Sequence, residues 1–281
     1  MQRRRFGKTE IDLPVIGQGT WNLPENRKSR NDAIAALRRG VELGMTHIDT
    51  AEMYGAGEVE RVVGEAIAPL DRDALFLVSK VLPSNAGYDG TLAAAKRSLE
   101  RLGTHYLDGY LLHWCGEYPL EETMRAMRTL IECGQIRFAG VSNCDVEELE
   151  IARRALAPFP LLCDQVLYHP FERTLEHRLL PYARTHEMPI VGYTPFGRRK
   201  IEALLADATL REIAAARGTA VRAIVLAFLT RDPLLFAIPK ASSIAHVEEN
   251  ARAGEIALGR EEIEAIDRAF PRGPLGDLAT I

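Results

Sequence analysis

The 281-residue sequence predicts a parallel (β/α)8 barrel, or TIM barrel, with an N-terminal β-hairpin and extra helices toward the C-terminus. Short and nearly continuous apolar runs alternate with longer amphipathic segments, which is typical of parallel strands buried on both faces and separated by helices. Eight such runs occur, and the chain is close to the ~250 residues that one barrel needs. We therefore expect a single barrel domain over residues 1–281.

The eight expected strands are separated by segments long enough to hold a helix each. They cover residues 15–17, 46–49, 75–80, 108–113, 138–142, 163–167, 189–193 and 235–239. Ahead of the first strand, residues 3–13 have Gly7-Lys8 at their centre. That turn signal predicts a small hairpin that closes the bottom of the barrel.

The helical segments are apolar on one face and carry start and stop signals. Ile34, Leu37 and Val41 recur at helical spacing behind a cap expected at Asn31 or Asp32, and glycine ends the pattern at position 44. The same features predict helices over residues 92–102 and 124–131, a helix pair within 201–230, and a last helix near 260–270.

A doubly wound dinucleotide-binding fold is the competing architecture. It requires a G-x-G-x-x-G turn directly after a strand and at the start of a helix. Gly17 and Gly19 are followed by Thr20-Trp21-Asn22, which provide neither the third glycine nor a helix start. The barrel is therefore favoured.

Composition limits the classes of partner. Hydrophobic residues make up 47% and charged residues 26%, which excludes a disordered chain. The net charge of −4 argues against nucleic acid and anionic membranes as main partners, and no apolar stretch approaches ~20 residues. We expect a cytoplasmic monomer or weak homo-oligomer that acts on a small molecule. The four cysteines lack C-x-x-C spacing and are expected to be reduced thiols: Cys115, Cys133, Cys144 and Cys163.

Polar or aromatic residues stand at the end of nearly every expected strand. In a parallel barrel these ends open at the same mouth, where barrel enzymes carry their active sites. The residues at these ends are Trp21, Asp49, Lys80, His113, Ser142, Asn143, Gln165, Tyr193 and Lys240. We therefore expect these side chains to line one pocket.

Four of the residues near this mouth suit carbonyl reduction. A lysine ammonium at Lys80 is expected to lower the pKa of the nearby Tyr54 phenol from ~10, and Asp49 is expected to keep the lysine charged. Tyr54 would then be the general acid, and His113 would orient the carbonyl oxygen. A proton donor with no metal ligand and no nucleophile suits hydride transfer from a cofactor.

The segment HIDTAEMYG at residues 47–55, the lysine of VSK at 78–80 and LLHW at 111–114 resemble the aldo-keto reductases, most closely short bacterial members that reduce small aldehydes such as methylglyoxal. Further matching blocks occur in order at 140–143, 164–165, 192–195, 238–240 and 249–250. The resemblance implies an oxidoreductase with a catalytic tetrad of Asp49, Tyr54, Lys80 and His113.

The resemblance also implies a nicotinamide cofactor, NADPH first and NADH as the alternative. Members of the family commonly have arginine at the position of His246 and serine or threonine at the position of Ala241, and both contribute to binding the 2′-phosphate of NADPH. In this chain Ser242 and Ser243 are expected to supply hydroxyls to that phosphate instead. The remaining implied contacts are Ser142, Asn143 and Gln165 on the carboxamide, Tyr193 on the nicotinamide ring, Lys240 on a phosphate, and Glu249 and Asn250 on adenine. Trp21 and Trp114 are expected to form an aromatic wall for the substrate.

Other interpretations remain open. A nucleotide-sensing subunit would bind the cofactor with little turnover, and a Schiff-base lyase would use Lys80 or Lys240, although Asp49 opposes a neutral Lys80. Residues 198–200 are either a solvated cationic loop or a clamp on the cofactor pyrophosphate. No metal role is expected for any histidine, and little sequence follows Pro271 to wall the pocket, so an open and tolerant aldehyde site is expected.

Overall fold

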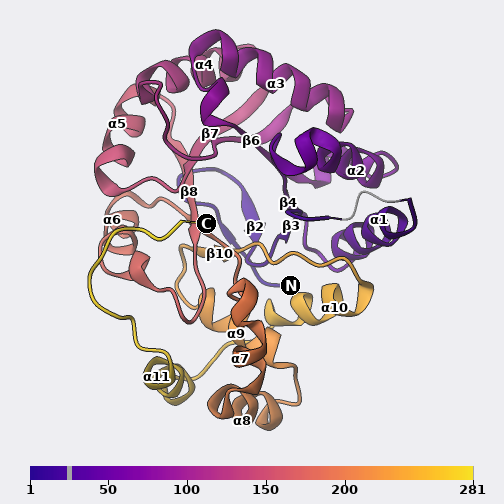
Figure 1. Ribbon diagram of the computed structural model, residues 1–281, viewed down its shortest axis with the longest axis vertical. Coiled ribbons are helices and arrows are strands. Elements are labelled where there is room, and N and C mark those ends of the chain that lie inside the picture. Colours follow the sequence, from indigo (N-terminus) through magenta and orange to yellow (C-terminus); the bar gives the residue numbers. More distant parts are fainter. Residues whose placement is uncertain (24–26, 281) are drawn as a thin grey trace.

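The computed structural model describes residues 1–23 and 27–280 and shows a ring of parallel strands surrounded by helices (Figure 1). Neighbouring strands pair in the order of the chain, from β3 to β10, and every pair is parallel. The strands are β3 (Gln18–Gly19), β4 (His47–Asp49), β5 (Phe76–Val81), β6 (Leu107–Leu112), β7 (Ile136–Ser142), β8 (Leu161–Leu167), β9 (Ile190–Tyr193) and β10 (Leu235–Ala237).

The two edges of this sheet meet and close the barrel. Parallel bridges join Ile16 to Ala237 and Gly19 to Lys240, so the chain around β3 pairs with the chain around β10. The (β/α)8 fold is thereby confirmed. The first strand lies at Gln18–Gly19 instead of residues 15–17, because only there does the chain also pair with β4.

Helices connect successive strands on the outside of the barrel (Figure 1). Helix α1 begins at Arg27, so the expected cap at Asn31 or Asp32 is wrong: both residues lie inside the helix. Arginine and lysine are good helix formers, which favours a start earlier than the cap-forming residues suggest. The connecting helices are α1 (Arg27–Glu42), α2 (Glu58–Ile67), α3 (Tyr88–Leu102), α4 (Leu120–Glu132), α5 (Val146–Leu156) and α6 (Leu179–His186).

The C-terminal third carries more helices than expected. Between β9 and β10 the predicted helix pair is a trio, because Asp207 ends α7 and its side chain caps the start of α8 by accepting a hydrogen bond from Leu210 N. The α7, α8 and α9 helices cover Ile201–Ala206, Ala208–Ala216 and Val221–Leu229. After β10 follow α10 (Ile244–Ala253), which the sequence pattern did not predict, and α11 (Arg260–Ala269), which it did.

Short 3-10 turns complete the connections. They are η1 (Tyr54–Gly57), η2 (Arg72–Ala74), η3 (Pro83–Asn85), η4 (Thr174–Glu176) and η5 (Arg198–Lys200).

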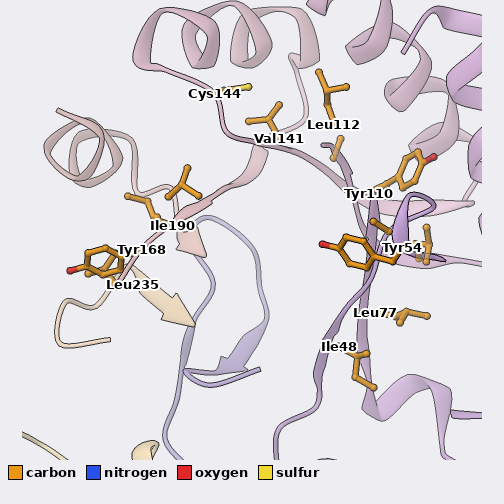
Figure 2. Packing of buried hydrophobic residues seen from close by; sticks show 14 of the residues in the cluster. Ile48, Tyr54, Leu77, Tyr110, Leu112, Val141, Cys144, Tyr168, Ile190 and Leu235 are labelled. Atoms are coloured by element: carbon orange, nitrogen blue, oxygen red, sulfur yellow. The ribbon is translucent and has the colours of Figure 1, made fainter. Parts of the chain in front are cut away.

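Apolar side chains of the strands pack outward against the helices, as Figure 2 shows for Ile48, Leu77 and Leu112. Within the described ranges, no helix is both long and apolar enough to cross a bilayer.

The predicted N-terminal hairpin is present and plugs the bottom of the barrel. Strands β1 (Arg3–Arg5) and β2 (Asp12–Pro14) pair antiparallel, and the turn between them starts at Phe6. The Phe6 ring is buried against Phe76 and Phe236, with ring centroids 5.9 and 4.8 Å away. This hydrophobic plug covers the end of the barrel where the strands begin.

Replacing Phe6 by alanine removes this plug. We expect Phe6→Ala to lower the free energy of unfolding by about 3–5 kcal/mol, the usual cost of truncating a buried phenylalanine. Denaturant unfolding followed by circular dichroism measures the change. Leu275→Ala is the matched control, because Leu275 is 65% exposed and its loss should change the free energy by less than about 0.5 kcal/mol. Equal effects of the two substitutions would contradict the role of the plug.

Candidate active site

The residues expected at the strand ends converge on one pocket at the carboxyl ends of the barrel strands. Lys80 is the exception, since it lies beneath the pocket floor and is 0% exposed. The pocket is lined by Trp21, Asp49, Tyr54, His113, Trp114, Ser142, Asn143, Gln165, Tyr193 and Lys240, together with Gly19, Thr20, Met53, Thr194, Arg198 and Ile238.

The Lys80 ammonium organises the floor of this pocket. Its Nζ atom donates to Asp49 Oδ1 at 2.5 Å, to the Thr50 carbonyl at 2.9 Å and to the Tyr54 hydroxyl at 3.2 Å. Lysine has three donors and no acceptor, so all three of its N–H groups are used. The neighbouring strands β4 and β5 supply Asp49 and Lys80, and η1 supplies Tyr54.

This arrangement fixes the direction in which Tyr54 can donate. Because the ammonium can only donate, the Tyr54 oxygen accepts that hydrogen bond, and its own O–H hydrogen is left for another partner. Figure 2 shows the Tyr54 hydroxyl pointing toward the interior of the barrel, and Tyr54 lines the pocket. The geometry therefore presents a phenol proton to whatever the pocket holds.

The second carboxylate oxygen of Asp49 is also bound. Gln165 Nε2 donates to Asp49 Oδ2 at 2.7 Å, so both oxygens of the buried carboxylate have partners. A buried charge is tolerated only when it is paired and hydrogen-bonded. Asp49 on β4 thus joins Lys80 on β5 to Gln165 on β8 in one continuous network.

The pKa values around Lys80 correct one expectation. Burial lowers the pKa of Lys80, but Asp49 and Tyr54 raise it by more, so the ammonium stays charged. Burial raises the pKa of Tyr54, and the charge of Lys80 only partly offsets this increase. The expected fall of the Tyr54 pKa below its usual value is therefore wrong for this structure. The phenol is fully protonated near neutral pH, which a proton donor requires.

His113 is neutral at physiological pH. Burial, and secondarily the charge of Lys80, lower its pKa to about 3. Its ring meets the Tyr54 ring edge to face, with centroids 5.7 Å apart, and its Nδ1 atom has no partner within the described part of the chain. A neutral imidazole beside the phenol is suited to donate or accept one hydrogen bond at the same substrate oxygen.

Asn143, Ser142 and Tyr193 form a second network on the opposite side of the pocket. Asn143 Nδ2 donates to the His113 carbonyl at 3.1 Å and to Ser142 Oγ at 3.0 Å, and Asn143 Oδ1 accepts from the Tyr193 hydroxyl at 2.8 Å. Asn143 also has a left-handed backbone, with φ of 58°, which asparagine tolerates better than most residues. The network fixes the Tyr193 ring in the pocket wall.

Two cations, Arg198 and Lys240, line the pocket mouth. The Arg198 guanidinium stacks on the Trp21 ring, 4.0 Å from its centroid, and Lys240 Nζ contacts Ser242 Oγ at 3.2 Å. Among the described residues, no carboxylate pairs with either cation. Of the two interpretations of residues 198–200, this placement of Arg198 at the pocket favours a role in ligand binding over that of a solvated loop.

The residues expected around the adenine end do not line this pocket, although Ser242 contacts Lys240, which does. Ser242 is in the loop after β10, and His246, Glu249 and Asn250 are on α10. His246 is exposed, Glu249 pairs with Arg222 at 3.4 Å, and Asn250 is buried with its Oδ1 atom lacking a protein partner in the described ranges. Their roles remain predictions.

Sequence reasoning missed several lining residues. Met53, Thr194 and Ile238 line the pocket without having been assigned a role. Met53 directly precedes Tyr54 and Thr194 directly follows Tyr193, so adjacency to assigned residues was the available signal. The Thr50 carbonyl that binds Lys80 is a backbone group, and no side-chain pattern could indicate it. The described residues after Pro271 contribute nothing to the pocket lining.

A model of the "Aldo/keto reductase family" matches residues 15–270. The chain belongs to the aldo/keto reductase family. It is 43% identical to methylglyoxal reductase YeaE of Escherichia coli (strain K12) over 272 residues, which are 96% of this chain and 95% of that protein. It is 31% identical to glyoxal reductase of Bacillus subtilis (strain 168), covering 92% of this chain and 89% of the relative.

A solved structure of an aldo/keto reductase from Klebsiella pneumoniae in complex with NADP and acetate superposes on this member of the family with a TM-score of 0.92. The two chains share 42% identity, and the match covers 99% of each. The predicted family, its barrel fold and the oxidoreductase class are thereby confirmed for this aldo/keto reductase.

The buried histidines make the stability of this aldo/keto reductase depend on pH. Burial lowers the pKa of His113 to about 3 and of His47 to about 4, below the value of 6.5 in an unfolded chain. The unfolded state therefore binds protons first as pH falls. We expect these two histidines to leave stability unchanged above pH ~6.5 and each to lower it by about 1.4 kcal/mol per pH unit between pH ~6.5 and its folded pKa.

Between pH 6.5 and 4 we expect the free energy of unfolding of His47→Asn to fall less steeply than that of the unsubstituted protein, by about 1.4 kcal/mol per pH unit. Urea unfolding at each pH measures this slope. His105→Asn is the control, since His105 is exposed. A pH slope in His47→Asn equal to that of the unsubstituted protein would rule out this contribution of His47.

Proposed function

We propose that this aldo/keto reductase reduces small aldehydes and ketones to alcohols with NADPH, and that 2-oxoaldehydes such as methylglyoxal are among its substrates. The single observation that carries the proposal is the contact of Lys80 with Tyr54 at the pocket floor. Support for the substrate class comes from the 43% identity to a methylglyoxal reductase. The protein would act as a single-domain monomer or weak homo-oligomer in the cytoplasm.

The residues present fit a nicotinamide dinucleotide. Lys240 and Arg198 are cations at the pocket mouth that pair with no carboxylate of residues 1–23 or 27–280, which suits an anionic pyrophosphate or phosphate. Burial lowers the pKa of Lys240, a cost that a bound phosphate would offset. Gln165 uses its Nε2 atom on Asp49 and lines the pocket, so its Oε1 atom is available to a carboxamide. When bound, NADPH supplies a hydride to the carbonyl carbon.

The chain itself supplies the proton and the orientation. Tyr54 Oη donates its proton to the carbonyl oxygen, while the Lys80 ammonium stabilises the negative charge left on the phenol oxygen. Asp49 keeps Lys80 charged through the 2.5 Å contact. Neutral His113, whose ring lies against that of Tyr54, hydrogen-bonds the same oxygen and fixes its position.

The pocket walls suit a small substrate with an apolar body. Trp21 and Trp114 lie on the loops after β3 and β6 and line the pocket, and Met53 adds a third apolar side chain. Since the described residues after Pro271 do not line the pocket, its walls would accept substrates of varied shape. We therefore propose a tolerant aldehyde site.

Replacing Tyr54 by phenylalanine tests the proton donor. Tyr54→Phe removes only the hydroxyl, so we expect kcat with methylglyoxal and NADPH to fall by about 10²–10⁴, the usual contribution of a general acid, with the affinity for NADPH unchanged. Turnover is followed by NADPH absorbance and binding by quenching of protein fluorescence. Tyr118→Phe is the control, because Tyr118 is exposed and lies outside the pocket.

Turnover of Tyr54→Phe close to that of Tyr118→Phe would reject the assigned role of Tyr54. Tight NADPH binding by the unsubstituted protein with negligible turnover over a broad aldehyde panel would instead favour a nucleotide sensor. Borohydride trapping of a substrate adduct on a lysine would favour a Schiff-base lyase.

His246 offers a test of the cofactor preference. A neutral histidine binds a phosphate less well than an arginine, whose guanidinium forms two parallel hydrogen bonds. Because His246 is exposed on α10, which follows Lys240 closely, we expect His246→Arg to lower the KM for NADPH roughly tenfold and to leave the KM for NADH unchanged. Steady-state kinetics with both cofactors measure the ratio. A similar change with both cofactors would contradict a 2′-phosphate contact at this position.

A further inference from the structure

Two cysteines that are far apart in the sequence meet behind the pocket wall. Cys115 lies in the loop after β6 and Cys144 in the loop after β7, and their Sγ atoms are 3.2 Å apart. Both are free thiols, Cys115 partly exposed and Cys144 buried. Figure 2 shows Cys144 close to Val141, near the end of β7. The fold thus turns what the sequence presented as isolated thiols into a dithiol.

The chemistry of the neighbours favours a redox pair over a metal centre. Glu148 is the one further ligand near the two sulfurs among the described residues, but its Oε2 atom accepts a hydrogen bond from Asp145 N at 2.8 Å, as part of the cap of α5. Asp164 lies beside Cys144, yet burial raises the pKa of its carboxyl group well above the usual range. The site therefore offers two thiols and one carboxylate that is already hydrogen-bonded, and among the described residues it lacks a full set of metal ligands.

The two thiols differ in accessibility in the way a redox pair requires. The Cys144 side chain is buried, so solvent oxidants do not reach it directly, and its hydrogen bond to Cys115 and its burial raise its pKa well above the usual value. Cys115 is partly exposed and is the sulfur that a small oxidant can reach. A reactive sulfur with a second sulfur in contact is the arrangement found in cysteines that are oxidised reversibly.

We propose that Cys115 and Cys144 form a reversible disulfide when the protein meets hydrogen peroxide, and that this bond lowers turnover at the adjacent active site. In the first step the Cys115 sulfur attacks a peroxide oxygen; the O–O bond breaks, one water leaves after protonation, and Cys115 becomes a sulfenic acid. In the second step Cys144 attacks that sulfur, the S–O bond breaks and a second water leaves. The two thiols together lose two protons and two electrons, and the peroxide is reduced to two waters.

The disulfide would act on the active site through the loops that carry it. Cys115 directly follows Trp114, and Cys144 directly follows Asn143, whose side chain already binds the His113 carbonyl at 3.1 Å. A disulfide requires the sulfurs to approach from 3.2 Å to ~2.05 Å, by rotation of the two side chains, by movement of the two loops, or by both. Because a misplacement of ~1 Å in a catalytic centre can cost on the order of 10²-fold in rate, loop movement passed on to Trp114 and Asn143 would lower turnover, and we expect at least a tenfold loss.

The bond itself is tested on Cys133→Ser protein, which removes the exposed cysteine that could link two molecules. After treatment with hydrogen peroxide we expect the intact mass to fall by two hydrogen atoms. The free thiols under denaturing conditions should fall from three (Cys115, Cys144 and Cys163) to one, and dithiothreitol should restore all three. Cys115→Ser and Cys144→Ala, each in the same background, should show no loss of hydrogen. Oxygen additions without a disulfide, or an unchanged mass, would overturn the proposal.

The effect on turnover is measured on the same samples. We expect oxidised Cys133→Ser protein to lose at least tenfold in kcat/KM for methylglyoxal and to recover it with dithiothreitol. Cys115→Ser should keep its activity through the peroxide treatment, which separates the disulfide from general oxidative damage. A disulfide that forms without changing kcat/KM would overturn the coupling to the active site. The mass measurement requires no turnover, so it does not depend on the proposed substrate.

Discussion

The structure of the active site depends on one buried ammonium group. Lys80 is fully buried, and its charge is tolerated because it donates to three acceptors. These are the Asp49 carboxylate, the Thr50 carbonyl and the Tyr54 hydroxyl. Removing a charge from water costs several kcal/mol, so this geometry depends on the contact between the ammonium and the Asp49 carboxylate. The same contacts set the positions of Asp49 and Tyr54 relative to each other. One electrostatic requirement thus fixes the distance between a strand end and the turn that carries the proton donor.

The fold was largely predictable because the apolar runs of a parallel barrel are buried on both faces and differ clearly from the helices between them. Boundaries were less predictable. Helix α1 starts at Arg27, ahead of the cap-forming residues, and α10 was missed because only Val247, Ala251 and Ala253 of its apolar positions are buried. Asp207 serves as the end of one helix and the cap of the next, a double role that sequence spacing does not reveal.

The candidate site was predictable at the strand ends, since topology alone brings those side chains to one mouth. The rest depends on distances across the fold. Whether burial or Lys80 decides the pKa of Tyr54 follows from the desolvation of the folded pocket, which the order of residues does not contain. The stacking of Arg198 on Trp21 and the contact between Cys115 and Cys144 each join loops from different strands. Loop conformation, which has no simple sequence signature, determines both.

The plugged end of the barrel has a consequence for handling the protein. The N-terminal amine lies at this closed end, where it pairs with Glu255 at 3.4 Å, whereas Gly276 and Leu278 line a hollow together with Asn143 beside the active-site pocket. Attachment to a solid support or a fusion partner through Met1 would hold the molecule with its pocket facing the bulk solution. Attachment through the C-terminal segment would crowd the entrance and slow the diffusion of substrate.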